Sequence, residues 1–320
     1  MYFKELFFDD SKRLRSGWRF AVFLAALLVG GGAFGAAAVA LIYGAGLPID
    51  QGGGVFFAIN SLLTLIPTLL VGWLCGKFLE GLPFKALGAW FTKYWFGHFV
   101  LGCLIGALTI CLAVVIAVVF GGLRFAPNIN ADTASIARTA ALALLVFAVA
   151  AAAEEALFRG YILQTFARSG LAWFAIIMTS IFFGLLHFGN PNAGNISTAN
   201  TMLAGIWFGV AYLKTRDLWF VWALHLVWNW MQGAVFGIEV SGLTDITTAP
   251  VLVELDTGPA WLTGGDYGIE GGLACTAALI VSTVSLYFLP ISKADPEMLA
   301  LTGPVETNGI DENQLTSSIT

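Results

Sequence analysis

Long apolar stretches alternate with short polar segments along nearly all of the 320 residues. A helix needs about 20 predominantly apolar residues to cross the ~30 Å hydrocarbon core of a membrane. The pattern predicts eight such helices, over residues 18–43, 55–79, 96–120, 135–158, 171–188, 196–213, 218–236 and 271–289. We expect the fourth helix to continue past Arg159 toward Thr165. The expected fold class is therefore all-α, a polytopic membrane protein with eight transmembrane helices.

The overall composition agrees with this picture. Hydrophobic residues make up 58% of the chain and charged residues 11%, with a mean hydropathy of +0.83. A soluble domain carries roughly a quarter charged residues, so this chain is a poor candidate for a water-soluble protein. No clustered basic face is present, which argues against a nucleic-acid partner. All four cysteines lie in apolar stretches, where we expect small buried hydrophobic side chains rather than metal ligands.

Lysine and arginine residues concentrate in alternate connecting segments, and this pattern orients the chain. Those on one side are Lys4, Lys12, Arg13, Arg15, Arg19, Lys77, Lys85, Lys93, Arg168, Lys214, Arg216 and Lys293. With eight helices, both termini are then expected in the cytoplasm, as in a bacterial inner-membrane protein. The first apolar run is too long for a cleavable signal peptide. The acidic loop 237–270, which has no Lys or Arg, is expected outside.

Three parts of the chain follow from these expectations. Residues 1–17 form a cytoplasmic N-terminal segment, and residues 18–292 form the membrane domain, whose core is expected at about 135–236. Residues 293–320 are too polar to pack against the membrane domain and are expected to form a disordered cytoplasmic tail. His98, next to the basic loop before the third helix, is interpreted as interfacial.

The fourth apolar stretch contains three charged residues in "AAAAEEALFRGY", Glu154, Glu155 and Arg159. A charge at the centre of a bilayer costs roughly 2.5–3.5 kcal/mol on insertion scales, so these residues need partners. Neighbouring residues on a helix point about 100° apart, so the two glutamates cannot face one point. Glu155 and Arg159 have the i, i+4 spacing of a helical ion pair. Glu154 therefore requires partners from other helices.

Two further helices supply polar groups at matching depth. Phe183 and His187 are four residues apart near the end of the fifth stretch, and His225 and Asn229 are four residues apart in the seventh. Each pair therefore shares one face of its helix. A rise of 1.5 Å per residue places Glu154, the two histidines and the asparagine about 12–22 Å from the basic side. We expect these groups to meet inside the membrane.

Glu154, His187, His225 and Asn229 indicate catalysis only when they are considered together. A glutamate–arginine pair in a membrane helix is often structural, and so is a single histidine bonded to a carbonyl group. Together, however, an unpaired carboxylate, two imidazoles and an amide provide a general base, an acid or electrophile and a neutral donor. These groups are the ones needed to activate water and stabilise an oxyanion. The sequence therefore predicts an intramembrane active site.

The same residues resemble a known family. "EEALFR" matches the pattern EExxxR, "FGLLH" matches FxxxH, and "HLVWN" matches HxxxN. In this order, on three separate predicted membrane helices, they are similar to the motifs of the CPBP intramembrane proteases (CAAX protease and bacteriocin-processing, or Abi, family), which include the type II CAAX prenyl endopeptidases. The resemblance covers about 135–236, roughly a third of the chain.

The resemblance implies a glutamate-dependent intramembrane endopeptidase. By position, Glu154 would activate the hydrolytic water and His187 would orient it. His225 and Asn229 would polarise the scissile carbonyl group and bind the oxyanion, and the supporting residues would be Glu155, Arg159 and Phe183. The expected partners are the lipid bilayer and a peptide or lipidated-peptide substrate. A peptide with a CAAX-like C-terminus is one such substrate. No cofactor and no metal are expected.

Three alternatives stay open at this point. The carboxylates and histidines are also the groups of an ion- or proton-coupled transporter, although they cluster at one level and no paired broken helices accompany them. A non-catalytic immunity or scaffold protein on the same fold would be expected to lack Glu154, His187 or His225. A zinc protease could use these same three residues as ligands, although no HExxH helix is present.

Overall fold

The computed structural model describes residues 3–9, 12–46 and 53–304, and helices occupy all eight predicted apolar stretches. The first half contains α1 (Phe3–Phe7), α2 (Ser16–Ala26), η1 (Leu27–Gly31), α3 (Gly32–Gly44), α4 (Gly54–Glu80), η2 (Phe84–Leu87), α5 (Trp95–Val119) and β1 (Leu123–Pro127). The central part contains α6 (Thr133–Glu155), η3 (Ala156–Ile162), α7 (Leu163–Ala167), α8 (Ala172–His187) and α9 (Asn195–Thr215). The last part contains α10 (Leu218–Trp230), η4 (Met231–Val235), β2 (Leu252–Asp256), α11 (Ala260–Thr263), η5 (Gly265–Tyr267), η6 (Ile269–Gly271), α12 (Leu273–Phe288) and α13 (Pro296–Thr302).

Five helices of the described chain are long and apolar enough to cross a membrane. They are Ser16–Gly44, Gly54–Glu80, Trp95–Val119, Thr133–Ala167 and Asn195–Thr215. α8 and α12 are shorter apolar helices, and α10 carries the polar residues of the seventh stretch. The structure thus confirms the prediction of a mostly helical protein with several candidate membrane spans, five by length and composition. The predicted number of eight spans stays a prediction. The fourth helix does continue past Arg159, through η3 to Ala167.

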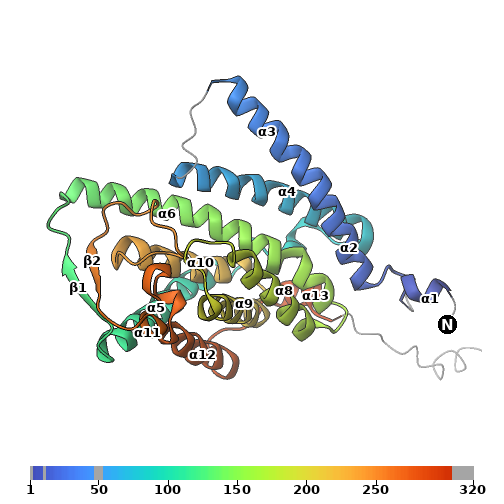
Figure 1. Cartoon of the computed structure of the whole chain (residues 1–320). Helices are drawn as coiled ribbons and strands as arrows, with labels where there is room; N and C mark the ends of the chain where they lie inside the picture. The colour runs from blue at the N-terminus through green and yellow to red at the C-terminus, as the bar shows by residue number, and fades with distance from the viewer. Residues whose placement is uncertain (1–2, 10–11, 47–52, 305–320) are drawn as a thin grey trace, which may run out of the picture.

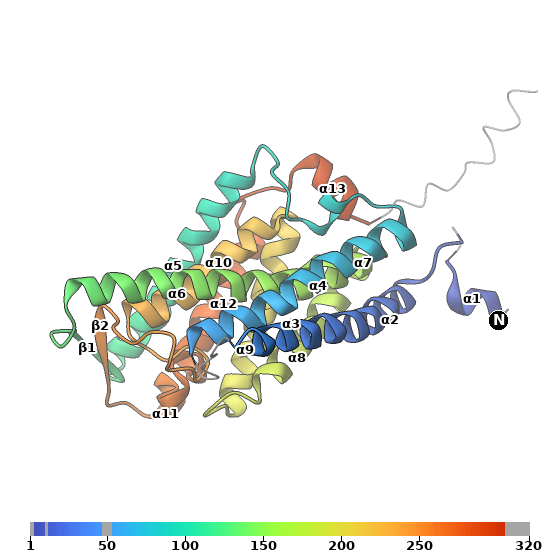
Figure 2. The ribbon, with the colours of Figure 1, turned by 90° about the horizontal axis from the view of Figure 1, so that it is seen from above.

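The helices form a bundle around α10. This helix packs against α5, α6 and α9, while α8 packs against α9, and α9 against α12. α4 lies along α6, and α3 diverges from α4 so that it projects away from the bundle (Figures 1 and 2). The centre of the bundle is therefore bounded by α6, α8, α9 and α10, the helices that carry the predicted site residues.

Small residues allow the closest of these helix contacts. Gly102 and Gly106 on α5 lie directly against the carbonyl oxygens of Phe220 and Leu224 on α10, where any Cβ atom would collide with backbone. Such spacing of small residues is typical of helix pairs in membranes, because it lets two backbones approach. The close contact between α5 and α10 fixes the position of His225, one residue after Leu224.

The two ends of the bundle differ in structure. Near one end of α6, β1 and β2 pair antiparallel, from Leu123 opposite Asp256 to Pro127 opposite Leu252 (Figure 1). The fold is mostly helical as expected, but this small sheet was not predicted. It escaped the sequence analysis because both strands lie in loops outside the apolar pattern, with paired residues 125 to 133 positions apart in the chain.

The opposite end carries α1 and α13 (Figure 2). We call it the basic end, because Lys4 lies in α1 and Lys85 and Arg216 contact α13. α13 corrects the expectation of a disordered tail over 293–320, since residues 296–302 form a helix that begins at the cap Asp295 and packs against η2 and α7. The Arg216 side chain donates a hydrogen bond to the Thr302 carbonyl oxygen at 2.8 Å, and Lys85 forms an ion pair with Glu297. The part of the predicted tail from residue 305 lies outside the described residues.

A buried ion cluster joins three helices at this basic end. Glu80, the last residue of α4, pairs with Arg19 of α2 and with Arg168, which follows α7. Arg168 uses two nitrogens, at 2.9 and 2.7 Å from the Glu80 carboxylate, and Thr165 donates to it at 3.0 Å. The side chain of His98, which the sequence analysis placed at the membrane interface, is buried within the protein, and its Nδ1 lies 2.8 Å from an Asp217 carboxylate oxygen. These contacts fix the ends of helices at a distance from the predicted site.

Candidate active site

Glu154 and Glu155 occupy the last two positions of α6, and their side chains point in different directions. The Glu155 side chain is 1% exposed, whereas that of Glu154 is 29% exposed. The divergence follows from the 100° rotation between neighbouring helical residues. Directly after Glu155 the chain forms the π-helical segment η3, in which Gly160 has non-helical dihedrals (φ −70°, ψ −114°). Single π turns of this kind are frequent at functional sites. Here the π segment carries Arg159.

Glu155 and Arg159 form the ion pair that their spacing predicts. Nη1 of Arg159 lies 3.1 Å from Oε1 of Glu155, and Nη2 donates to the Gly205 carbonyl oxygen on α9 at 2.9 Å. The Arg159 side chain is fully buried. Its guanidinium carbon also lies 5.0–5.6 Å from the ring centroids of Phe158, Phe183 and Phe208, within the range of cation–π contacts. Arg159 therefore links α6, α8 and α9 through one side chain.

His225 shares the same carboxylate oxygen. Its Nδ1 lies 2.8 Å from Oε1 of Glu155, and its ring stacks on Phe208 with centroids 4.5 Å apart. A carboxylate accepts hydrogen bonds, so Nδ1 carries a hydrogen and Nε2 faces the opposite way. Nε2 lies 3.8 Å from Oε2 of Glu154. Glu155 thus orients His225 toward Glu154.

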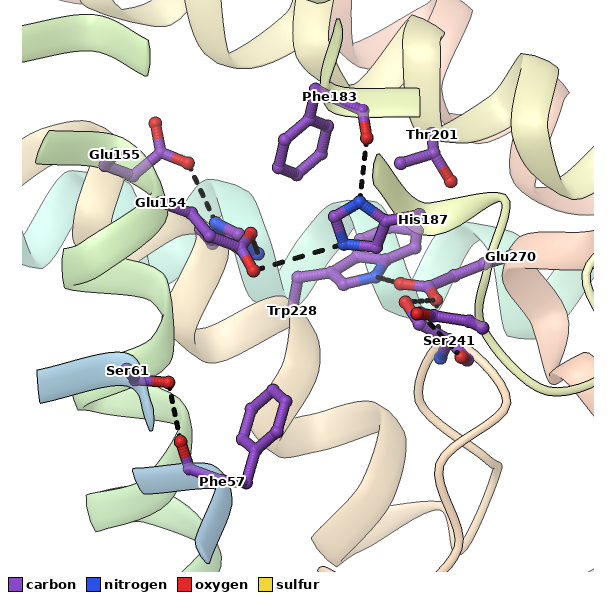
Figure 3. A network of polar contacts seen from close by, with 12 residues as sticks. Phe57, Ser61, Glu154, Glu155, Phe183, His187, Thr201, Trp228, Ser241 and Glu270 are labelled. Carbon is purple, nitrogen blue, oxygen red and sulfur yellow. Dashed lines mark hydrogen bonds and ion pairs between the residues drawn. The ribbon is translucent and has the colours of Figure 1, made fainter. Parts of the chain in front are cut away.

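His187, the last residue of α8, approaches Glu154 from the other side. Its Nδ1 lies 2.8 Å from the Phe183 carbonyl oxygen, which can only accept. The neutral ring therefore carries its hydrogen on Nδ1 and a lone pair on Nε2. Nε2 lies 4.0 Å from Oε1 of Glu154, the contact drawn in Figure 3. The Phe183 ring lies next to both imidazoles, with centroids 4.6 Å from His187 and 6.2 Å from His225.

These residues line one cavity of about 330 Å³. Its wall includes Glu154, His187, His225 and Asn229, the last one helical turn beyond His225. Oε2 of Glu154 is buried and has no hydrogen-bond partner among the described residues. The separations of 3.8 and 4.0 Å between Glu154 and the imidazoles exceed hydrogen-bond length, and gaps of this size between polar groups commonly hold a bridging water. The sequence-predicted residues therefore converge on one polar centre.

Sequence reasoning missed three residues of the same cavity. Glu270, in η6, accepts hydrogen bonds from Trp228 Nε1 at 2.9 Å and from the Ser241 backbone and hydroxyl at 2.8 and 2.7 Å (Figure 3). In the sequence, Trp228 is one of several tryptophans in an apolar stretch and is interpreted as a packing residue. Glu270 belongs to the acidic loop 237–270, where it is interpreted as solvent-exposed. The one signal for Glu270 in the sequence is its position immediately before the last apolar stretch.

The described residues contain no group of three or more His, Cys, Asp and Glu side chains arranged to hold a metal ion. A zinc site built from Glu154, His187 and His225 would need all three ligand atoms about 2.0–2.2 Å from one ion. In this geometry each imidazole Nε2 faces a different carboxylate oxygen. The three side chains thus surround one position, between the carboxylate and the two imidazoles.

The comparisons with known proteins agree with the predicted resemblance. Residues 136–231, from α6 to the first residue of η4, match the family model described as type II CAAX prenyl endopeptidase Rce1-like. This match covers 96 of the 320 residues; it confirms the resemblance predicted from the motifs and supports an enzyme. All seven predicted site residues lie inside it.

One curated relative matches a short part of the chain. A stretch of 80 residues is 34% identical to "Uncharacterized protein YyaK" of Bacillus subtilis (strain 168), which covers 25% of this chain and 24% of the relative. The chain thus matches about a quarter of that relative's length. No solved structure matches the chain.

Proposed function

We propose that this protein is an intramembrane endopeptidase that cleaves a membrane-associated peptide with water activated by Glu154. The observation that carries the proposal is the Glu154 carboxylate, which lies between the Nε2 atoms of His187 and His225 in a cavity and has a buried oxygen without a partner in the described chain. A buried acceptor without a partner is costly unless a ligand or water fills its place. The match to a protease family supports the same activity.

The mechanism follows from the protonation of each group. Glu154 accepts a proton from water while the water oxygen attacks the peptide carbonyl carbon. His187 holds that water through the lone pair on Nε2, because its Nδ1 hydrogen is committed to the Phe183 carbonyl group. As the C–N bond breaks, Glu154 returns the proton to the leaving nitrogen. Water is consumed and a carboxyl and an amine terminus are formed.

The oxyanion of the tetrahedral intermediate is assigned to His225 and Asn229. For this role His225 must donate from Nε2 while Nδ1 donates to Glu155, so the ring must carry two hydrogens. The surrounding charges favour that form, because Glu154 and Glu155 carry two negative charges and Arg159 carries one positive charge. A protonated His225 makes the group of four neutral. Asn229 supplies a neutral donor beside it.

The membrane arrangement is part of the proposal. The basic end, with α1 and α13, would face the cytoplasm of a bacterial inner membrane, with both termini on that side. The acidic loop 237–270 would face the opposite side. The substrate would be a peptide within or next to the bilayer, and a CAAX-like C-terminus is one form that the family name suggests.

The decisive experiment compares the peptides released by wild-type protein and by Glu154→Gln. Both proteins are reconstituted in lipid vesicles and mixed with solubilised membrane-protein fragments and with a prenylated CAAX peptide, and new termini are identified by mass spectrometry. We expect Glu154→Gln to lower cleavage by a factor of about 10²–10⁴ or more, because a general base contributes on that scale. An exposed carboxylate, Asp266→Asn, serves as the control. Retention of half the wild-type turnover by Glu154→Gln would disprove the assignment.

Metal content separates this mechanism from the zinc alternative. We expect the purified active protein to contain less than stoichiometric metal and to keep its activity in a chelator. One zinc per chain, with activity lost on chelation and restored by zinc alone, would instead favour Glu154, His187 and His225 as ligands.

A further inference from the structure

The cavity wall changes in chemical character around Glu154 and His187. It contains Phe57 of α4 and Phe147 of α6, and it also contains Ser241 and Glu270, which precede α12 in the chain. In Figure 3, Phe57 lies below the Glu154–His187 contact, whereas Glu270 lies to the right, beyond His187. A peptide that places a bond at Glu154 therefore meets apolar side chains in one direction and a carboxylate in another.

The Glu270 carboxylate has neutral partners and no cation. Its three hydrogen-bond donors are an indole N–H, a backbone N–H and a hydroxyl group. In the described chain no Lys or Arg nitrogen lies within 4.0 Å of it, and no Lys or Arg lines the cavity. The adjoining loop 237–270 contains no Lys or Arg either. In the described chain, no Lys or Arg side chain beside the cavity balances the charge of Glu270.

Two physical consequences follow for a ligand. An ionised carboxylate has about four acceptor positions, and the three donors leave one of them open. An uncompensated charge in a cavity with apolar walls interacts strongly with an opposite charge, because little water screens it. Positive groups are therefore favoured beside Glu270 and negative groups are repelled.

We propose that Glu270 is a specificity-determining residue that binds a lysine or arginine side chain of the substrate, at one fixed position on one side of the bond that is cut. The inference rests on the proposed protease function and names its substrate class: a membrane-associated peptide with a basic residue on one side of the scissile bond and apolar residues on the other. Ser241 and Trp228 act as positioning residues, since they hold the carboxylate toward the cavity.

The experiment is a cleavage-site profile on a peptide library of random sequence, with the protein in lipid vesicles and mass-spectrometric readout. We expect wild-type protein to enrich Lys and Arg at least fivefold at one position relative to the cut. Glu270→Gln, which keeps the shape of the side chain, should remove this enrichment, and Glu270→Lys should replace it with Asp and Glu. Asp266→Asn removes one exposed charge from the same loop and should keep the wild-type profile.

The remaining outcomes distinguish specificity from a merely structural role. Ser241→Ala removes one hydrogen bond but keeps the charge of Glu270, so the basic preference should persist. If Glu270→Gln lowers the melting temperature and leaves the cleavage profile unchanged, Glu270 only anchors the loop and the proposal is wrong. A profile without any basic preference in the wild-type protein also overturns it. If the wild-type protein cuts nothing, or cuts equally well with Glu154→Gln, it is the protease function itself that fails.

Discussion

Glu80 at the end of α4 and Glu154 near the end of α6 are carboxylates on two helices that pack together, and they have opposite surroundings. Both oxygens of Glu80 are bonded, to Arg19, to Arg168 and to Thr165. Glu154 has no hydrogen bond from the described residues and faces two imidazole nitrogens at 3.8 and 4.0 Å. One carboxylate is saturated by its own protein, and the other is left open toward a cavity.

The difference shows how the same residue type serves two purposes in one bundle. A saturated carboxylate joins helices and has no acceptor position left for a ligand. An open carboxylate inside a protein is costly, so its retention points to a ligand or a reaction. Glu155 is intermediate, because one oxygen binds both Arg159 and His225 while the other is buried without a partner in the described chain. The bonded oxygen of Glu155 is the one that holds Arg159 and His225 in place.

The largest effect on both stability and activity is expected when the ion pair between Glu155 and Arg159 is broken. Glu155→Ala leaves Arg159 buried without its ion-pair partner. Arg159→Ala leaves Glu155 buried without its ion-pair partner. Breaking a buried ion pair typically costs about 3–5 kcal/mol. Each change should lower the melting temperature in detergent and reduce cleavage, since His225 also loses its fixed orientation.

A charge reversal tests whether the pair itself matters. The double variant Glu155→Arg with Arg159→Glu should recover part of the stability lost in the single variants, although His225 then lacks an acceptor at its former place. The bracing role is contradicted if both single variants melt at the wild-type temperature.

An effect on stability alone is expected at the saturated site. Glu80→Ala leaves the buried side chains of Arg19 and Arg168 without their carboxylate. We expect a loss of about 3–5 kcal/mol in the free energy of unfolding, the usual cost of breaking a buried ion pair. Cleavage per folded molecule, measured well below the melting temperature, should stay within twofold of wild type. Loss of cleavage without loss of stability would remove the contrast between Glu80 and Glu154.

The sequence predicted the parts of the molecule that depend on local periodicity. Apolar runs located every long helix, because burial in lipid requires them. The 100° step between helical neighbours separated Glu154 from Glu155, and the i, i+4 rule paired Glu155 with Arg159. The structure places these three residues, with His187 and His225, around one centre.

The missed features depend on chain segments that meet only after folding. Glu270 reaches the cavity because its loop returns to α10, and no local pattern records such a return. The pairing of β1 with β2 and that of His98 with Asp217 are likewise contacts between distant segments. The π turn at Ala156–Ile162 was missed for another reason, since its residues have ordinary helix-forming patterns.

Glu254 on β2 presents a third surrounding for a carboxylate, in which other carboxylates are the neighbours. Burial, together with the charges of Glu239 and Asp256, raises the pKa of Glu254 from 4.5 to about 8. The folded protein therefore holds this proton more tightly than the unfolded chain does. Its favourable contribution is complete below about pH 4.5 and is lost as the pH rises toward 8.

The smallest expected effect is the removal of this pH dependence by Glu254→Gln. At pH 5 the variant and the wild-type protein should differ little, because the wild-type side chain is largely protonated in the folded state. At pH 8.5 the variant should be more stable by about 1 kcal/mol, allowing for partial solvent screening, or about 2–4 °C in melting temperature. Asp266→Asn, at an exposed position of the same loop, should show no such change with pH. An equal difference at both pH values would mean that amide packing, rather than charge repulsion among Glu239, Glu254 and Asp256, accounts for the effect.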